Sequence, residues 1–130
     1  MSFMNDNTEQ LKNTLREIFE KNHQITVISL SNPTGLPIVS MERKKNGEIV
    51  ELDVGTSNRF AALMGASGSL ADRTLSTFSD EKTRIINIRG KNNDCSISIS
   101  DYLIVLVVTK PFGSATRIAE KLNASLKGMI

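Results

Sequence analysis

The chain has 130 residues, of which 39% are hydrophobic and 23% charged, the balance of a folded domain rather than of a disordered chain. Sixteen basic against fourteen acidic residues give a net charge of +2, which is too small to predict a nucleic-acid partner. One cysteine, no leader-like start and no apolar run of about 18 residues predict a single cytoplasmic domain over 1–130, without disulfides or membrane insertion.

The first part of the chain predicts a helix followed by a hairpin. Apolar residues recur every three or four positions over 8–21, which is typical of an amphipathic helix. The β-branched segments 25–31 and 36–42, joined by a turn with proline and glycine, predict two antiparallel strands. The segment 43–53 is charged and contains an Asn-Gly turn signal, so a short further strand over 49–52 is one interpretation of it.

The second part predicts one long helix, three strands and a final helix. The long helix covers 53–78, the strands cover 83–89, 95–99 and 102–108, and the last helix lies around 118–126. The run 102–108 is apolar on both faces, which indicates a central strand covered on both sides. The order of elements is therefore α-β-β-α-β-β-β-α.

The long helix contains no charged residue over 60–71. A bulky stripe runs from Phe60 to Phe78, is widened by Leu63 and Leu70, and is expected to pack on the protomer's own sheet. Small residues remain on another side of the helix. Interior glycines lower helix stability, and the close approach of another backbone is the simplest reason for their presence. These small residues are Ala62, Gly65, Ala66 and Ser69. We predict that a second copy covers them; the alternative is a quiet surface that tolerates small residues.

Three segments resemble the Roadblock/dynein-light-chain family. The segment 25–39 has the family's strand, its turn with a residue-Gly pair and its Leu-Pro-Ile-Val return. The segment 60–75 resembles the alanine-rich second helix, and 102–113 resembles the closing strand before the last helix. The resemblance covers about 8–128, whereas the connector 43–53 is longer and more hairpin-like than in the family.

The resemblance implies a profilin-like or longin-like α+β sandwich, with a five-stranded antiparallel sheet in the order 2-1-5-4-3. The first and third helices would cover one face and the second helix the other. It also implies a homodimer that pairs second helices and third strands, and that acts as a scaffold, a motor light chain or a regulator of a Ras-like small GTPase. As a sheet edge, strand 83–89 would be an aggregation hazard that self-pairing removes. The predicted dimer interface comprises Ala62, Gly65, Ala66, Ser69, Ile85, Ile86, Asn87 and Ile88.

The residues do not predict catalysis. The single histidine, His23, has polar neighbours typical of a solvated loop, and Cys95 has no Cys-x-x-Cys partner. The sequence contains no phosphate-binding glycine motif and no metal-ligand spacing. We therefore expect no enzymatic activity and no cofactor.

Charged residues around the uncharged stretch are candidates for binding a partner. Arg59 precedes it and Asp72 and Arg73 follow it, so these residues flank a partner groove or keep the helix ends soluble. Lys44 and Lys45 belong with Arg43 to a basic cluster that is either a solvated turn or a contact for an acidic partner. A profilin-like module that senses a small ligand between sheet and helix is the alternative function.

Overall fold

Three α-helices and six strands make up the part of the chain that the structure describes. The computed structural model describes residues 3–129, with side chains from 8 to 129. The helices are α1 (Phe3–Lys21), α2 (Val54–Ser76) and α3 (Ala115–Leu126), followed by a 3-10 turn, Lys127–Met129. The strands are β1 (Ile25–Ser31), β2 (Pro37–Arg43), β3 (Ile49–Glu51), β4 (Ile85–Arg89), β5 (Asp94–Ile99) and β6 (Ile104–Thr109). The first and last helices begin earlier than predicted, because their first turns add little to the apolar periodicity.

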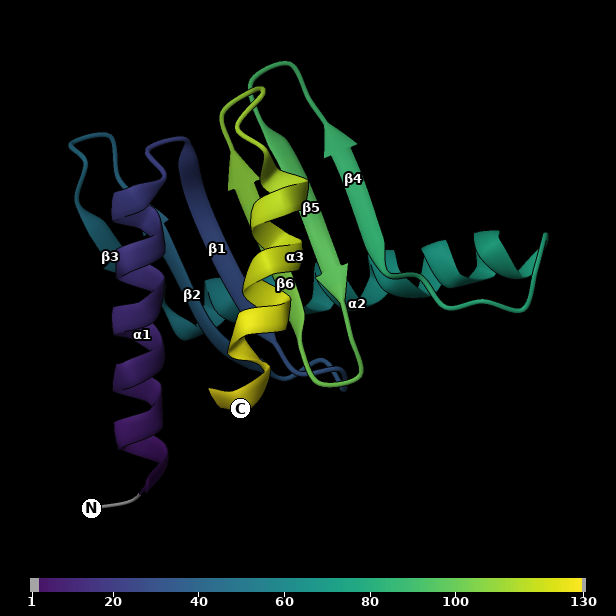
Figure 1. Cartoon of the computed structure of the whole chain (residues 1–130), viewed down its shortest axis with the longest axis horizontal. Helices are drawn as coiled ribbons and strands as arrows, with labels where there is room; N and C mark the ends of the chain where they lie inside the picture. The colour runs from purple at the N-terminus through teal and green to yellow at the C-terminus, as the bar shows by residue number, and fades with distance from the viewer. Residues whose placement is uncertain (1–2, 130) are drawn as a thin grey trace.

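The strands form one antiparallel sheet in the order β3-β2-β1-β6-β5-β4 (Figure 1). The five predicted strands keep their predicted order, but the predicted number was wrong because β3 adds a sixth strand beside β2. The chain reverses at Asn46-Gly47, where Gly47 has a φ of +91°, a conformation that favours glycine. Arg43 then pairs with Ile49, and Met41 pairs with Glu51. The charged connector is therefore largely a hairpin at one edge of the sheet.

Helices α1 and α3 cover one face of the sheet and α2 crosses the other, as the resemblance implied (Figure 1). Under α1 and α3, Leu15 and Phe19 pack with Leu122 against the sheet. Val105 and Val107 of β6 point into this core, whereas Leu106 points into the core under α2. These three residues are buried, which confirms that β6 is a central strand covered on both sides.

A carboxylate caps the start of α2, and three hydroxyl groups join its first turns to the sheet. The Asp53 carboxylate caps the helix by accepting the Thr56 N–H at 2.7 Å. One turn later, the Ser57 hydroxyl donates to the Ser40 hydroxyl at 2.6 Å, and Ser40 also bonds the Ser29 hydroxyl at 2.7 Å. All three serines are buried, so this chain of hydroxyls determines which side of α2 faces the sheet.

Arg43, the first residue of the basic cluster, links β2 to the end of α1. Its guanidinium donates to the carbonyls of Phe19, Asn22 and Ile25 at 2.5, 3.2 and 3.1 Å. The guanidinium carbon also lies 5.6 Å from the centre of the Phe19 ring. A cation at a helix C-terminus satisfies carbonyls that have no partner within the helix. Arg43 is therefore a structural residue, and the expectation that it belongs to a solvated turn was wrong.

Candidate functional site

Two adjacent stripes of α2 face away from the sheet. The small-residue stripe consists of Ala62, Gly65, Ala66 and Ser69, of which only Gly65 is half-buried and the rest are exposed. The leucine stripe consists of Arg59, Leu63, Leu70 and Arg73, all of them exposed. Neither stripe is covered by another part of the described protomer. An exposed apolar surface on a soluble domain commonly marks an interaction site.

The leucine stripe differs from the sequence-based prediction. Leu63 and Leu70 were expected on the sheet, but they are 60% and 66% exposed, and Phe78 beyond the helix end is 82% exposed. The buried residues of α2 are Ser57, Ala61 and Met64, which share one side of a helix at a spacing of four and three. Because the serine hydroxyls hold this side against the sheet, the two leucines point to the opposite side.

The two interior glycines of α2 have different surroundings. A Cβ atom at Gly68 would lie 3.4 Å from Ile99 Cδ1, so Gly68 allows the helix to pack closely on β5. A Cβ atom at Gly65 would meet nothing within 4 Å. The described protomer therefore gives no reason for glycine at position 65, despite its cost of about 1 kcal/mol in a helix. A second molecule on the small-residue stripe would provide one.

Arg59 and Arg73 lie at the two ends of the leucine stripe. They are 14 residues apart, which corresponds to about 21 Å along a helix. Leu63 and Leu70 lie between them, seven residues or about two helical turns apart. The arrangement is a pair of exposed leucines with a cation about one turn beyond each of them.

Asp72, also predicted to flank a partner groove, lies beside β4 instead. Its carboxylate accepts the backbone N–H of Thr83 at 2.7 Å, and this hydrogen bond lowers the pKa of Asp72. The contact joins the last turns of α2 to the segment that leads into β4. Asp72 therefore positions the helix relative to the sheet edge.

The β4 edge, defined as Ile85–Arg89, is the second exposed part of the predicted interface. β4 is the last strand of the sheet, next to β5 alone. Ile85 and Ile86 are half-buried, Asn87 is exposed and Ile88 is 50% exposed. Figure 1 shows the C-terminal turns of α2 projecting beyond β4. The last turns of α2 and the β4 edge thus border the same side of the molecule, whereas Gly68, in the middle of the helix, lies over β5.

Lys44 and Lys45 lie away from this edge, in the turn between β2 and β3. This turn belongs to the opposite end of the strand order. Both lysines are exposed, and Lys44 Nζ lies 3.9 Å from Glu48 Oε1. The structure therefore does not bring them to the β4 edge.

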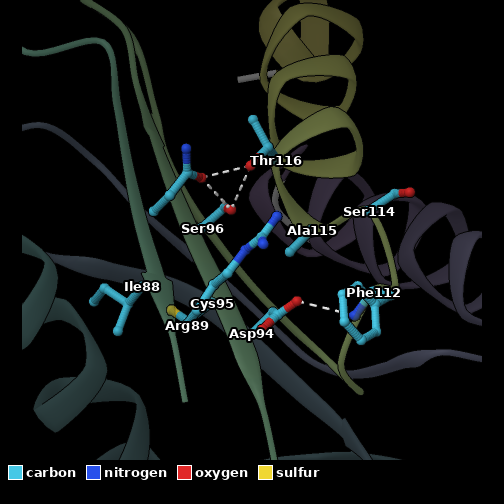
Figure 2. Close-up of a pocket in the computed structure, with 10 residues that line it drawn as sticks. Ile88, Arg89, Asp94, Cys95, Ser96, Phe112, Ser114, Ala115 and Thr116 are labelled. Atoms are coloured by element: carbon cyan, nitrogen blue, oxygen red, sulfur yellow. Dashed lines mark hydrogen bonds between the residues drawn. The ribbon is translucent and has the colours of Figure 1, made fainter. Parts of the chain in front are cut away.

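A surface cavity of about 310 Å³ lies between β4, β5 and the start of α3. Figure 2 shows the Arg89 side chain extending into this space past Ser96 and toward Ala115. On one side Asp94 Oδ2 accepts the backbone N–H of Phe112 at 3.0 Å. The sequence does not predict this cavity, because its residues come from segments that only the folded sheet brings together.

Solved structures of similar fold were found for MglB and Roadblock proteins. The gliding protein MglB from Thermus thermophilus superposes with a TM-score of 0.73 at 9% identity, over 99% of this chain and 92% of that chain. An MglB structure with a tetrameric arrangement gives 0.75 at 10% identity, over 95% and 89%. A Roadblock/LC7 domain from Streptomyces avermitilis gives 0.56 at 17% identity, over 79% and 86%. The chain has a Roadblock/LC7-like fold. No family model and no curated protein matches the sequence.

The Roadblock/LC7-like fold confirms the family resemblance of the hairpin, the long helix and the closing strand. Chemistry-bearing residues lie apart in it: His23 is exposed in the turn after α1, and Cys95 is half-buried on β5. Burial raises the pKa of the Cys95 thiol, which disfavours the reactive thiolate. Among the side chains of residues 8–129 no cluster of three metal-binding groups occurs. Each helix within 3–129 is too short or too polar to span a bilayer.

Proposed function

We propose that the chain forms a homodimer that binds a Ras-like small GTPase, as a regulator or as a scaffold. The observation that carries the proposal is the pair of uncovered stripes on α2 beside the open β4 edge. The Roadblock resemblance implies this function, and the tetrameric arrangement of a similar MglB structure supports self-association. The protein would contribute a surface and no catalytic group of its own.

The two stripes of α2 suit two different partners. The small-residue stripe allows the backbone of a second helix to approach closely, so we assign it to the second copy. The leucine stripe then remains accessible on both copies and forms a joint surface for the GTPase. A partner bound on the two-fold axis blocks its symmetric twin, so we expect one GTPase per dimer. Any effect on GTP hydrolysis would come from ordering the switch segments of the GTPase.

Light scattering tests the dimer by itself. At micromolar concentration the chain should have about twice its mass of 14.3 kDa. Ala66→Arg should give a monomer, because it places an unpaired charge in the helix contact. Ala124→Arg, the same substitution at an exposed position of α3, is the matched control and should remain dimeric. A wild-type monomer at this concentration would contradict the proposal.

Titration calorimetry with a small GTPase from the same cell tests the partner. Affinity should differ between the GDP form and a form with a non-hydrolysable GTP analogue, since the γ-phosphate orders the switch segments. Ala66→Arg should abolish binding, and Ala124→Arg should not. Replacing Lys44 and Lys45 by serine should weaken binding modestly and only at low salt. Full binding by the monomeric variant would contradict the shared surface, and equal affinity for both nucleotide forms would indicate a passive scaffold.

A further inference from the structure

The two ends of the strands differ in charge. Figure 1 shows four connecting segments together at the top of the molecule, namely 22–24, 44–48, 90–93 and 110–114. These segments contain four lysines and one acidic residue. Four other segments connect the opposite ends of the strands and contain two basic and four acidic residues; they are 32–36, 52–53, 77–84 and 100–103. A chain with a net charge of only +2 is therefore polarised along its strands.

The four lysines form a row that we call the basic rim. They are Lys44, Lys45, Lys91 and Lys110, and all of them are exposed. Of these four, only Lys44 has an ion-pair partner among the described side chains, since its Nζ lies 3.9 Å from Glu48 Oε1. The turn with Lys44 and the turn with Lys91 are four strand spacings apart, or roughly 19 Å. The rim therefore offers positive charge over a broad surface and not in a single pocket.

One large apolar side chain projects from the same end of the sheet. Phe112 is 87% exposed, more than any other large hydrophobic side chain that the structure describes. Its φ of +65° is uncommon for a bulky residue, and its backbone N–H donates to Asp94 Oδ2 at 3.0 Å (Figure 2). At the next residue, Gly113, a Cβ atom would lie 2.6 Å from Thr109 Cβ and 2.9 Å from Gln24 Cβ. The loop is thus packed tightly against the ends of β1 and β6, and it presents Phe112 to solvent next to the basic rim.

We propose that this end of the protein binds the surface of an anionic membrane. Lysines attract anionic lipid headgroups, and an exposed aromatic ring is stabilised when it enters the more apolar layer just below them. The basic rim and Phe112 provide both features at one end of the sheet. An acidic chain in water would satisfy the lysines but has no apolar layer for the ring. The contact involves side chains of a single protomer, so it does not rest on the proposed homodimer, and no segment crosses the bilayer.

Cosedimentation with vesicles tests the charge of the basic rim. The full chain should bind vesicles of phosphatidylcholine with about one-third phosphatidylserine, and should bind far less to phosphatidylcholine alone. Binding should fall as the salt concentration is raised, because salt screens exposed charges. Lys91→Gln together with Lys110→Gln should weaken binding by about tenfold, since each lysine near an anionic surface contributes to the attraction.

Lys82→Gln together with Arg84→Gln is the matched control for these vesicles. It removes the same charge from two exposed residues that lie toward the opposite end of the strands. Because that end is further from the membrane than a Debye length, binding should change by less than about twofold.

Phe112→Trp tests the aromatic contact directly. The chain contains no tryptophan, so the introduced indole is the only one that reports. Its emission should shift to shorter wavelength with the phosphatidylserine vesicles and not with phosphatidylcholine alone, because the ring leaves water only in the first case. Phe78→Trp is the control, since Phe78 is 82% exposed but lies in the segment 77–84, away from the basic rim. Its emission should not change with either kind of vesicle.

The opposite results would overturn the proposal. Equal binding to both kinds of vesicle, or binding to neither, would exclude recognition of an anionic surface. An equal loss in the two double variants would show that net charge acts and not the basic rim. An unchanged emission of the Phe112 variant on vesicles that the protein binds would place the membrane contact elsewhere. Binding of duplex DNA or polyglutamate without binding of vesicles would assign the rim to a soluble polyanion.

Discussion

The two faces of the sheet are covered to different degrees. Under α1 and α3, the large side chains of Leu15, Phe19 and Leu122 are at most 2% exposed. Under α2, Met64 is fully buried, but Phe60 packs beside it only half-buried. The first face has a complete hydrophobic core within one protomer, and the second face does not.

Two neighbouring rows of cross-strand pairs show where the coverage by α2 ends. One row is almost entirely buried and consists of Ser40, Ser29, Leu106, Ile97 and Ile86. The next row is half-buried or exposed and consists of Val50, Glu42, Val27, Val108, Cys95 and Ile88. The second row is mainly apolar and ends at the β4 edge. The first face therefore stabilises the protomer, whereas the second leaves apolar side chains that the described protomer covers only in part.

The largest effect is expected from truncating the complete face. Phe19→Ala removes a buried ring and the surface on which Arg43 stacks, so it should lower the free energy of unfolding by about 3–5 kcal/mol. Urea unfolding followed by circular dichroism measures this loss, which should be the same at all protein concentrations. A loss below about 1 kcal/mol would contradict the assignment of the main core to this face.

A smaller loss is expected from Arg43→Met, which keeps much of the aliphatic stem but removes the guanidinium. Three backbone carbonyls near the end of α1 would each lose one donor, although those of Phe19 and Asn22 would keep a backbone N–H. We expect a loss of about 2 kcal/mol, since hydrogen bonds from a charged group contribute roughly 1.5–3 kcal/mol and water partly replaces them. Lys44→Met, at the next and exposed position, is the control and should change stability by less than about 0.5 kcal/mol.

The order of the elements and the central position of β6 could be predicted because each leaves a local pattern. The run 102–108 is apolar at successive positions, and this pattern alone places the strand between two layers. The pairing of β3 with β2 could not be predicted in the same way, since an Asn-Gly signal predicts a turn but not whether the three residues of β3 pair with the preceding strand.

The side of α2 that faces the sheet follows the predicted stripe, since Met64 is buried and Phe60 is half-buried, but the width of that stripe could not be predicted from periodicity. Over 60–71 the helix has no charged residue, so the pattern offers little contrast between its sides. The bond between Ser57 and Ser40 selects the side, and it joins residues 17 positions apart. The exposure of Ala62, Ala66 and Ser69 agrees with the prediction that the small residues remain uncovered. The exposure of Leu63 and Leu70 was not predicted.

Asp72 provides a test of how α2 is held at the edge of the incomplete face. Asp72→Ala removes the acceptor of the Thr83 N–H and should cost about 1 kcal/mol at pH 7. Because the folded protein lowers the pKa of Asp72, the stabilisation is present above the ordinary value of 3.8 and is lost as the pH falls through the lower folded value. Thermal unfolding of both proteins between pH 7 and pH 2.5 should show the two stabilities converging in acid. A constant difference would indicate that the charge of Asp72 does not contribute.

The smallest effect on the protomer is expected from Leu70→Ser on the leucine stripe. The side chain is 66% exposed, so its removal leaves the core intact and should change the free energy of unfolding by less than about 0.5 kcal/mol in dilute monomer. At high concentration, a partner that binds only the folded state raises apparent stability by mass action. Because Leu70 belongs to the leucine stripe, which stays accessible in the proposed dimer, Leu70→Ser should leave the melting temperature unchanged at low and at high protein concentration, which calorimetry at two concentrations measures. A large loss in dilute protein would mean that this side of α2 belongs to the core of the protomer, and the contrast between the two faces would not hold.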